Sequence, residues 1–336
     1  MTLIRPGTGV AEASGPERRP GTGRAVAVLV LVALGASIPL LGPSVALHET
    51  GEAAAPGVRG VGLLRAVLFA ALCVPLGELF VRRLARSVPG APPAGPPSWA
   101  PYAAGTGFVA ALGLASVVAT GNLVPGGVAE IDVGGLYESR EGKLALIEVN
   151  AFLAAGLCAL SRRPATQVWP LAAVIVAEAL RAHPAPEDTA LVGSGLTLVH
   201  LTCASLWTGG LVYALRTLRH WRSSPTAGAA LLGLYARVAV VLLAVITATG
   251  VWSSLRRMPS GTILEQLTAT AYGRALLAKV LLVAAVAALA LWARIRLGRA
   301  ADPLSACSPA RAEVVALGMV VAVSGLLTAL PLPIRW

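Results

Sequence analysis

The chain has 336 residues, of which 56% are hydrophobic and 13% are charged, and its formal net charge is +11. The apolar residues come in long blocks, which is the profile of a polytopic membrane protein and not of a soluble domain. A basic excess of this size could also suggest nucleic acid, but the charges lie at the ends of the apolar blocks, where membrane topology requires them. We therefore expect the lipid bilayer, and no nucleic acid, as the surrounding partner.

Apolar blocks of roughly 17–25 residues can each cross a bilayer as one helix. They predict an all-α transmembrane bundle of about nine spans, or eight if the short fifth block does not cross. The blocks are 25–47, 60–81, 102–121, 144–161, 167–182, 191–215, 229–252, 273–296 and 313–331. Residues 1–23, rich in Gly, Pro, Arg and Glu, are predicted to be a disordered cytoplasmic tail. Residues 87–101 are rich in proline and are predicted to be a linker that is not helical throughout.

The basic residues predict the orientation of the bundle. If the N-terminus is cytoplasmic, the inner segments hold twice as many Lys and Arg residues as the outer segments. The C-terminus is then predicted to lie outside. The first apolar block is too long for a signal peptide and lacks a clear cleavage site, so we interpret it as a retained helix. The expected organisation is helices 1–4 over residues 24–165 and helices 5–9 over residues 166–336.

Two parts of the chain echo each other. The tripeptide ATG at 119–121 ends the third span and Gly142 opens the fourth, while ATG at 248–250 ends the seventh and Gly273 opens the eighth. This pattern predicts two four-helix units, spans 1–4 and 5–8, repeated in the same orientation, as occurs in transporters. Chance matching of Ala- and Gly-rich helices is the alternative. His200 has no counterpart in the first unit, so the repeat would concentrate function in the second.

Three histidines are predicted to lie on or below the outer face. His48 ends the first span, His183 ends the fifth, and His200 lies about nine residues, or ~13 Å, below the outer surface. Imidazole and carboxylate ligands suit Cu(II), whereas thiol and thioether ligands suit Cu(I). These residues predict a metal path from His48 and His183 down to His200. The alternative is that His200 only hydrogen-bonds a neighbouring helix and that the other two are ordinary interfacial residues.

Other polar residues within the spans need partners because charge is costly in the membrane. Arg237 and Lys279 are the deepest, and buried ion pairs are the alternative to a functional role. Glu178 is a candidate to support the outer metal site or accept a proton from it. Cys203, one turn beyond His200, is interpreted as packing among small residues, and Trp207 with the glycines after it as an anchor and a close helix contact.

Several short motifs, taken together in order and spacing, resemble the copper resistance protein D (CopD) family of bacterial membrane proteins. They are AH at 182–183, HLTCASLWTGGL at 200–211, LYARVA at 234–239, ATG at 248–250, TAYGRALLAKV at 270–280 and RAEVVALGMVVAVSGLLTALP at 311–331. The resemblance implies copper transport across the bacterial cell membrane, usually inward, beside a small extracytoplasmic copper-binding protein. The implied cargo is a copper ion, whose oxidation state the sequence does not determine. The matching positions are His183 and His200 as ligands, with Trp207, Arg237, Tyr272, Arg274 and Lys279 in support.

Two other functions are compatible with the same residues. A helical bundle with histidines at suitable depths could bind b-type haem as a membrane redox protein. The chain could also be an accessory membrane subunit without transport of its own. No P-loop, HExxH, CxxC or GxSxG motif occurs, so we expect no hydrolytic or nucleotide-driven activity, no catalytic residues and no enzyme.

Overall fold

The computed structural model describes residues 22–331 except 122, 124–125, 128–129, 184–188, 259 and 300–307. Within these residues the fold is helical, and no strand is present. The helices are α1 (Thr22–Leu47), α2 (Val58–Ala85), α3 (Ala100–Ala119), α4 (Val133–Glu138), α5 (Arg140–Leu160), α6 (Val168–Arg181), α7 (Ala190–His220), α8 (Pro225–Arg257), α9 (Ile263–Ala269), α10 (Ala271–Arg299) and α11 (Ser308–Leu327). Each of the nine predicted spans corresponds to one of the longer helices. The predicted tail lies almost wholly outside the described residues.

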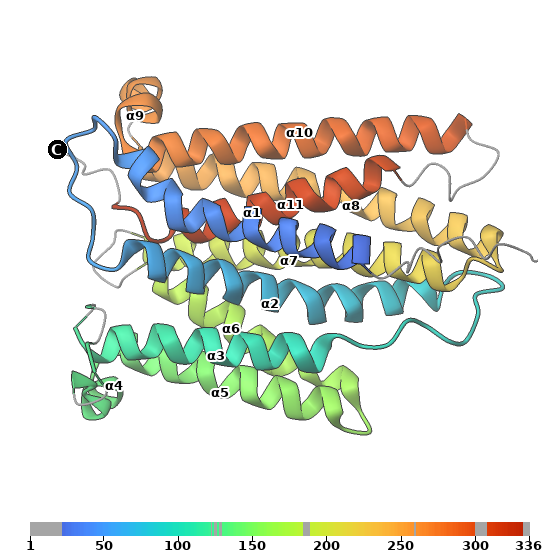
Figure 1. Ribbon diagram of the computed structural model, residues 1–336, viewed down its shortest axis with the longest axis horizontal. Helices are drawn as coiled ribbons and strands as arrows, with labels where there is room; N and C mark the ends of the chain where they lie inside the picture. The colour runs from blue at the N-terminus through green and yellow to red at the C-terminus, as the bar shows by residue number, and fades with distance from the viewer. Residues whose placement is uncertain are drawn as a thin grey trace, which may run out of the picture.

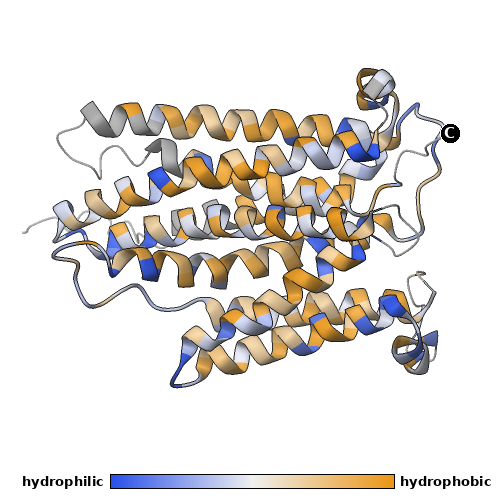
Figure 2. Cartoon of the chain, turned by 180° about the vertical axis from the view of Figure 1, so that it is seen from behind, coloured by the Kyte–Doolittle hydropathy of each residue, from blue (hydrophilic) through white to orange (hydrophobic). Residues whose placement is uncertain are grey.

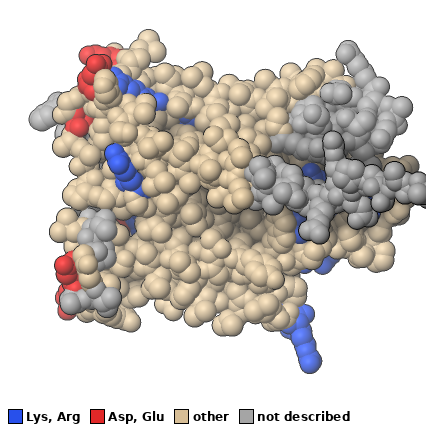
Figure 3. All heavy atoms as spheres, in the orientation of Figure 1, with Lys and Arg blue, Asp and Glu red and all other residues tan. Residues whose placement is uncertain are grey.

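The long helices lie side by side and alternate in direction, so that successive connections fall at opposite ends of the bundle (Figure 1). In the described part of the chain, 7 helices are long and apolar enough to cross a membrane. Apolar residues cover the middle of the bundle and polar residues lie toward the two ends (Figure 2). The acidic side chains visible in Figure 3 lie at the end that carries α4 and α9. The protein is therefore a multi-pass membrane protein, as predicted.

The short fifth span is real but differs from the other spans. Its helix, α6, has 14 residues, or about 21 Å at the helical rise, which is less than a bilayer core. A 3₁₀ turn at Pro164–Gln167 precedes it and extends its reach. Together they connect the end of α5 at one side of the bundle with the start of α7 at the other (Figure 1).

Helices α2 and α7 cross at the centre of the bundle through glycines. A Cβ atom on Gly209 would overlap the carbonyl of Cys73, and one on Gly77 would overlap the backbone between Gly209 and Gly210. Small residues allow two membrane helices to approach this closely, and dispersion contacts between the backbones then hold them together. The close helix contact predicted for this glycine pair is confirmed.

The two segments that echo each other in sequence share a local structure. Each has a long helix, a short helix (α4 or α9) and a second long helix. The side-chain oxygens of Ser139 and Thr270 accept hydrogen bonds from the backbone N–H groups of Gly142 (3.0 Å) and Gly273 (2.9 Å). Each glycine is the third residue of its helix, and a Cβ there would overlap the backbone of the short helix. Glycine is needed at both positions because the short helix lies against it.

Beyond these caps the two segments diverge. Helices α3 and α5 pack closely, with the ring of Phe152 filling the space beside Gly107. Their sequence counterparts α8 and α10 do not pack in this way, and both line a cavity instead. The space between α3 and α5 is therefore filled, whereas α8 and α10 leave a space that a ligand could enter.

The proline-rich linker, residues 87–101, is hydrogen-bonded to the end of α7 by its extended part. Three side chains of that end donate hydrogen bonds to carbonyl groups of the linker: Trp221 Nε1 to Ala94 (2.9 Å), Tyr213 Oη to Pro96 (3.4 Å) and Arg216 Nη2 to Pro97 (2.6 Å). The linker is not helical throughout, as predicted, because only its last two residues belong to α3, and it lies against the bundle.

Two charged residues complete this end of the bundle. The guanidinium of Arg216 lies 3.5 Å from the ring centre of Trp99, a cation–π contact. The fully buried carboxylate of Glu78 pairs with Arg82 (2.8 Å) and accepts the backbone N–H of Trp99 (3.2 Å). A charge buried in this way is tolerated because both of its oxygens have donors nearby.

Candidate functional site

A cavity of about 440 Å³ lies between α2, α6, α7, α8, α10 and α11. The part of its lining that lies nearest the end of the bundle that carries α9, here called the rim, comes from the ends of α6, α8 and α10 and includes Arg257 and Tyr272. Trp207, which is buried, lines its deeper part near the middle of α7. The cavity thus extends from this end of the bundle toward its middle.

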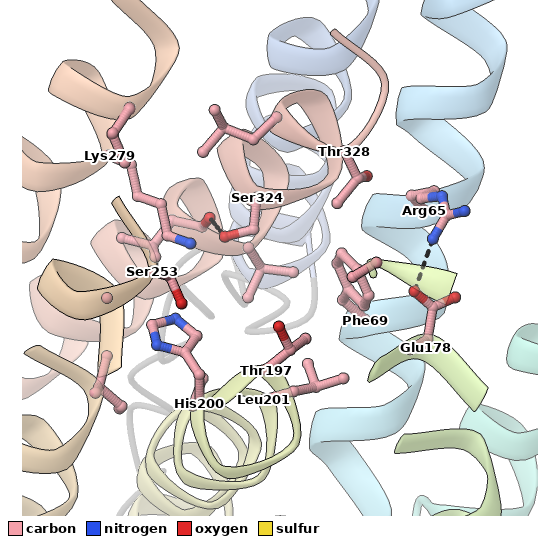
Figure 4. A pocket seen from close by; sticks show the side chains of 18 of the residues that line it. Arg65, Phe69, Glu178, Thr197, His200, Leu201, Ser253, Lys279, Ser324 and Thr328 are labelled. Atoms are coloured by element: carbon pink, nitrogen blue, oxygen red, sulfur yellow. Dashed lines mark hydrogen bonds and ion pairs between the residues drawn. The ribbon is translucent and has the colours of Figure 1, made fainter. Parts of the chain in front are cut away.

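His200 projects from α7 into this cavity (Figure 4). Its Nδ1 atom lies 3.0 Å from the hydroxyl oxygen of Thr249 on α8. That hydroxyl has one hydrogen, and the carbonyls of Val245 (2.7 Å) and Ile246 (3.1 Å) accept it. The network therefore assigns Nδ1–H as the donor to Thr249, which leaves the lone pair of Nε2 available. A neutral imidazole oriented by a second hydrogen bond is the usual form of a metal-binding histidine.

His183 lies near His200 in space but does not line the cavity. Its side chain is buried, and its Nε2 atom lies 3.1 Å from the hydroxyl of Thr197. Thr197 lines the cavity one turn of α7 before His200. Gly193 leaves room for the His183 ring, because a Cβ there would overlap Nδ1. Thr197 thus stands between His183 and the cavity.

His48 is placed differently from the other two histidines. Its side chain is 72% exposed beyond the end of α1, with the carboxylate of Glu49 3.8 Å away. Its backbone carbonyl accepts a hydrogen bond from Arg274, which also bonds the carbonyl of Thr268 (2.7 Å). Among the described residues, no three His, Cys, Asp or Glu side chains are close enough to hold a metal ion together. The three candidate ligands therefore do not form one site.

Charged residues line the wall of the cavity beside α2 and α6. Glu178, predicted to support a metal site, forms an ion pair with Arg65 at 2.7 Å, which Figure 4 shows. Arg181 lies 3.9 Å from the same carboxylate and 3.1 Å from Glu148, which is fully buried. These two arginines and two glutamates form a buried cluster that joins α2, α5 and α6. Glu178 is therefore engaged by arginines at the edge of the cavity.

Lys279 reaches the cavity from the opposite wall. Figure 4 shows its amine pointing into the space from α10, toward the side from which Ser253 and His200 project. No carboxylate within the described residues pairs with it. Arg257 at the rim donates to the hydroxyl of Tyr272 (3.2 Å) and to the carbonyl of Ala182 (3.4 Å).

The residues expected to support the site fall into two groups. Trp207, Tyr272 and Lys279 line the cavity together with His200. Arg274 lies outside it and ties the end of α1 to the segment after α9. Arg237 is exposed on α8 and does not line the cavity.

Sequence reasoning missed several cavity residues. Ser253, Ser324, Thr197 and Cys73 all line it, as does Arg257. A polar residue within a membrane span was the available signal, since hydroxyl groups in apolar helices need partners. That signal does not say which residues face a common space, because this depends on the rotation of each helix.

The comparisons with known proteins bear on the second half of the chain. Residues 229–329 match the family model of copper resistance protein D. This stretch includes most of α8 and all of α9, α10 and α11, which contribute Thr249, Ser253, Lys279 and Ser324 around His200. No curated protein and no solved structure matches the chain.

Proposed function

Because the chain carries a copper resistance protein D domain at residues 229–329, we propose that it transports copper across the bacterial cell membrane through the cavity beside His200. The family match makes this a membrane protein connected with copper resistance. In the proposal, the N-terminus is cytoplasmic, the C-terminus and the mouth of the cavity face outward, and copper moves inward. The basic residues concentrated in the opposite connections support this orientation.

The observation that carries the proposal is the hydrogen bond that fixes the tautomer of His200. Its Nδ1–H is held by Thr249, so that Nε2 can bind a metal ion that enters the cavity. Thr249 belongs to the matched domain, which therefore orients the ligand even though His200 itself precedes the domain. We assign His48 and His183 to the approach from outside, with His48 exposed at the surface and His183 one helical turn from His200 through Thr197.

Replacing His200 with alanine is expected to remove most of the copper flux, by at least about ten-fold, since the cavity loses its imidazole donor. The measurement is copper entry into proteoliposomes loaded with a fluorescent copper chelator. His220→Ala is the matched control, because that histidine is exposed at the far end of α7. If His200→Ala and His220→Ala carry copper equally well, His200 is not the transfer ligand. If wild-type vesicles take up no copper, the chain does not transport it alone.

Replacing Thr249 with valine keeps the shape of the side chain but removes the acceptor of His200 Nδ1–H. The imidazole then loses its fixed tautomer, and we expect copper affinity to fall by about 10–100-fold. Equilibrium dialysis with radioactive copper measures this change. Thr247→Val on the same helix is the control, because that hydroxyl is exposed and bonds only its own helix. Equal affinities for the two variants would contradict the proposed role of Thr249.

A further inference from the structure

The cavity is too large for a bare copper ion and, within the described residues, has too few metal-binding side chains to hold one. Its volume of about 440 Å³ lies in the range of pockets for small organic molecules. An ion held by protein atoms at about 2 Å would need a much smaller space with several ligands. His200 is the one imidazole in the wall, and no group of three metal-binding side chains occurs in the described part of the chain. An ion bound there must bring further ligands with it.

The charges of the wall point to the nature of those ligands. Four cationic side chains line the cavity, against the single carboxylate of Glu178: Arg65, Arg181, Arg257 and Lys279. Arg65 and Arg181 are balanced by Glu178 and by the buried Glu148 behind it. Lys279 has no such carboxylate among the described residues, although it projects into a space surrounded by apolar helices. A charge in this setting is costly unless an opposite charge accompanies it.

We propose that the cavity accepts copper as a small anionic chelate, in which the ion binds Nε2 of His200 and a carboxylate of the chelator binds Lys279. The proposal rests on the proposed function in copper transport. The hydroxyl groups of Ser253 and Ser324 line the same space. Ser324 donates its hydrogen to the carbonyl of Val320, so Ser253 is the one of the two that offers a donor to a remaining oxygen of the chelator. The cationic wall would repel a hydrated cation but attract a complex with net negative charge. Arg257 at the rim extends the same attraction to the mouth of the cavity.

The test compares two copper complexes of opposite charge on the purified full-length protein in lipid nanodiscs. The probes are copper(II) citrate, which is anionic, and copper(II) bis(ethylenediamine), which is cationic. The variants are Lys279→Met and, as a matched control, Lys143→Met. Lys143 is the only other lysine of the chain and is exposed near the start of α5. Lys279→Arg keeps the charge, and thermal melting verifies that each variant is folded.

We expect copper citrate to bind at least about ten-fold more tightly than the cationic complex, since hydrogen bonds between charged groups contribute factors of this size. Lys279→Met should lose that preference, while Lys279→Arg and Lys143→Met retain it. His200→Ala should weaken copper citrate but not metal-free citrate.

Three other outcomes would distinguish failure of the chelate proposal from failure of the proposed copper transport. If the cationic complex binds as well as copper citrate, the chelate proposal is wrong and copper transport still stands. If metal-free citrate binds as tightly as copper citrate, the cavity is an anion site unrelated to copper. If no copper complex binds or crosses the membrane, the proposed function itself fails.

Discussion

Replacing Gly209 with alanine is expected to prevent assembly of the bundle. A methyl group at this position would overlap the backbone carbonyl of Cys73, which cannot move aside as a flexible side chain could. The two central helices α2 and α7 would have to separate, and α2 also contacts α1, α3 and α11. Overpacking of a core costs about 1–3 kcal/mol where side chains can shift, and backbone overlap places this variant at or above the upper end. We expect loss of the monodisperse peak in size-exclusion chromatography after detergent extraction.

Gly233→Ala is the control for this prediction. Gly233 lies within α8, and nothing lies within 4 Å of the position of its missing Cβ. Alanine there should be neutral or stabilise the helix by about 1 kcal/mol, because it favours helix more than glycine does. A Gly209→Ala variant as stable as Gly233→Ala would show that α2 and α7 do not cross as described.

Replacing Glu178 with leucine is expected to destabilise the protein strongly, by about 3–5 kcal/mol, because it leaves the guanidinium of Arg65 buried without its carboxylate. The two side chains are 14% and 5% exposed, so solvent cannot replace the lost partner well. The thermal midpoint of the purified protein in detergent measures the loss.

The double variant Arg65→Met with Glu178→Leu tests whether the unpaired arginine causes this loss. Removing both charges avoids an unpaired ion, so most of the lost stability should return. If the double variant is as unstable as Glu178→Leu, the cost comes from packing around Glu178 and not from the orphaned arginine.

The membrane spans were predictable because length and hydropathy alone determine whether a helix can cross a bilayer. The short helices α4 and α9 were not, since each has at most seven residues and owes its position to the glycine it lies against. The docking of the linker was also missed. Its contacts are hydrogen bonds to backbone carbonyls, which leave no mark in the pattern of side chains.

The candidate site was predictable in part. His200 and Lys279 could be named because polar residues at depth stand out in an apolar helix, and Trp207 and Tyr272 because of the family resemblance; all four line the cavity. Their common orientation toward one space depends on helix rotation and on the separation of α8 from α10, which packing between distant segments determines. The ligand roles of His48, His183 and His200 stay predictions.

The linker between α2 and α3 shows which sequence changes this end of the protein can tolerate. All three hydrogen bonds from the end of α7 reach main-chain carbonyls, of Ala94, Pro96 and Pro97, and proline leaves its carbonyl free to accept. The side chains of these linker residues could therefore change without loss of a bond, provided the chain stays extended. Trp99 is the exception, because Arg216 stacks on its ring. Among related chains, we expect this segment to vary widely in sequence around a fixed aromatic residue.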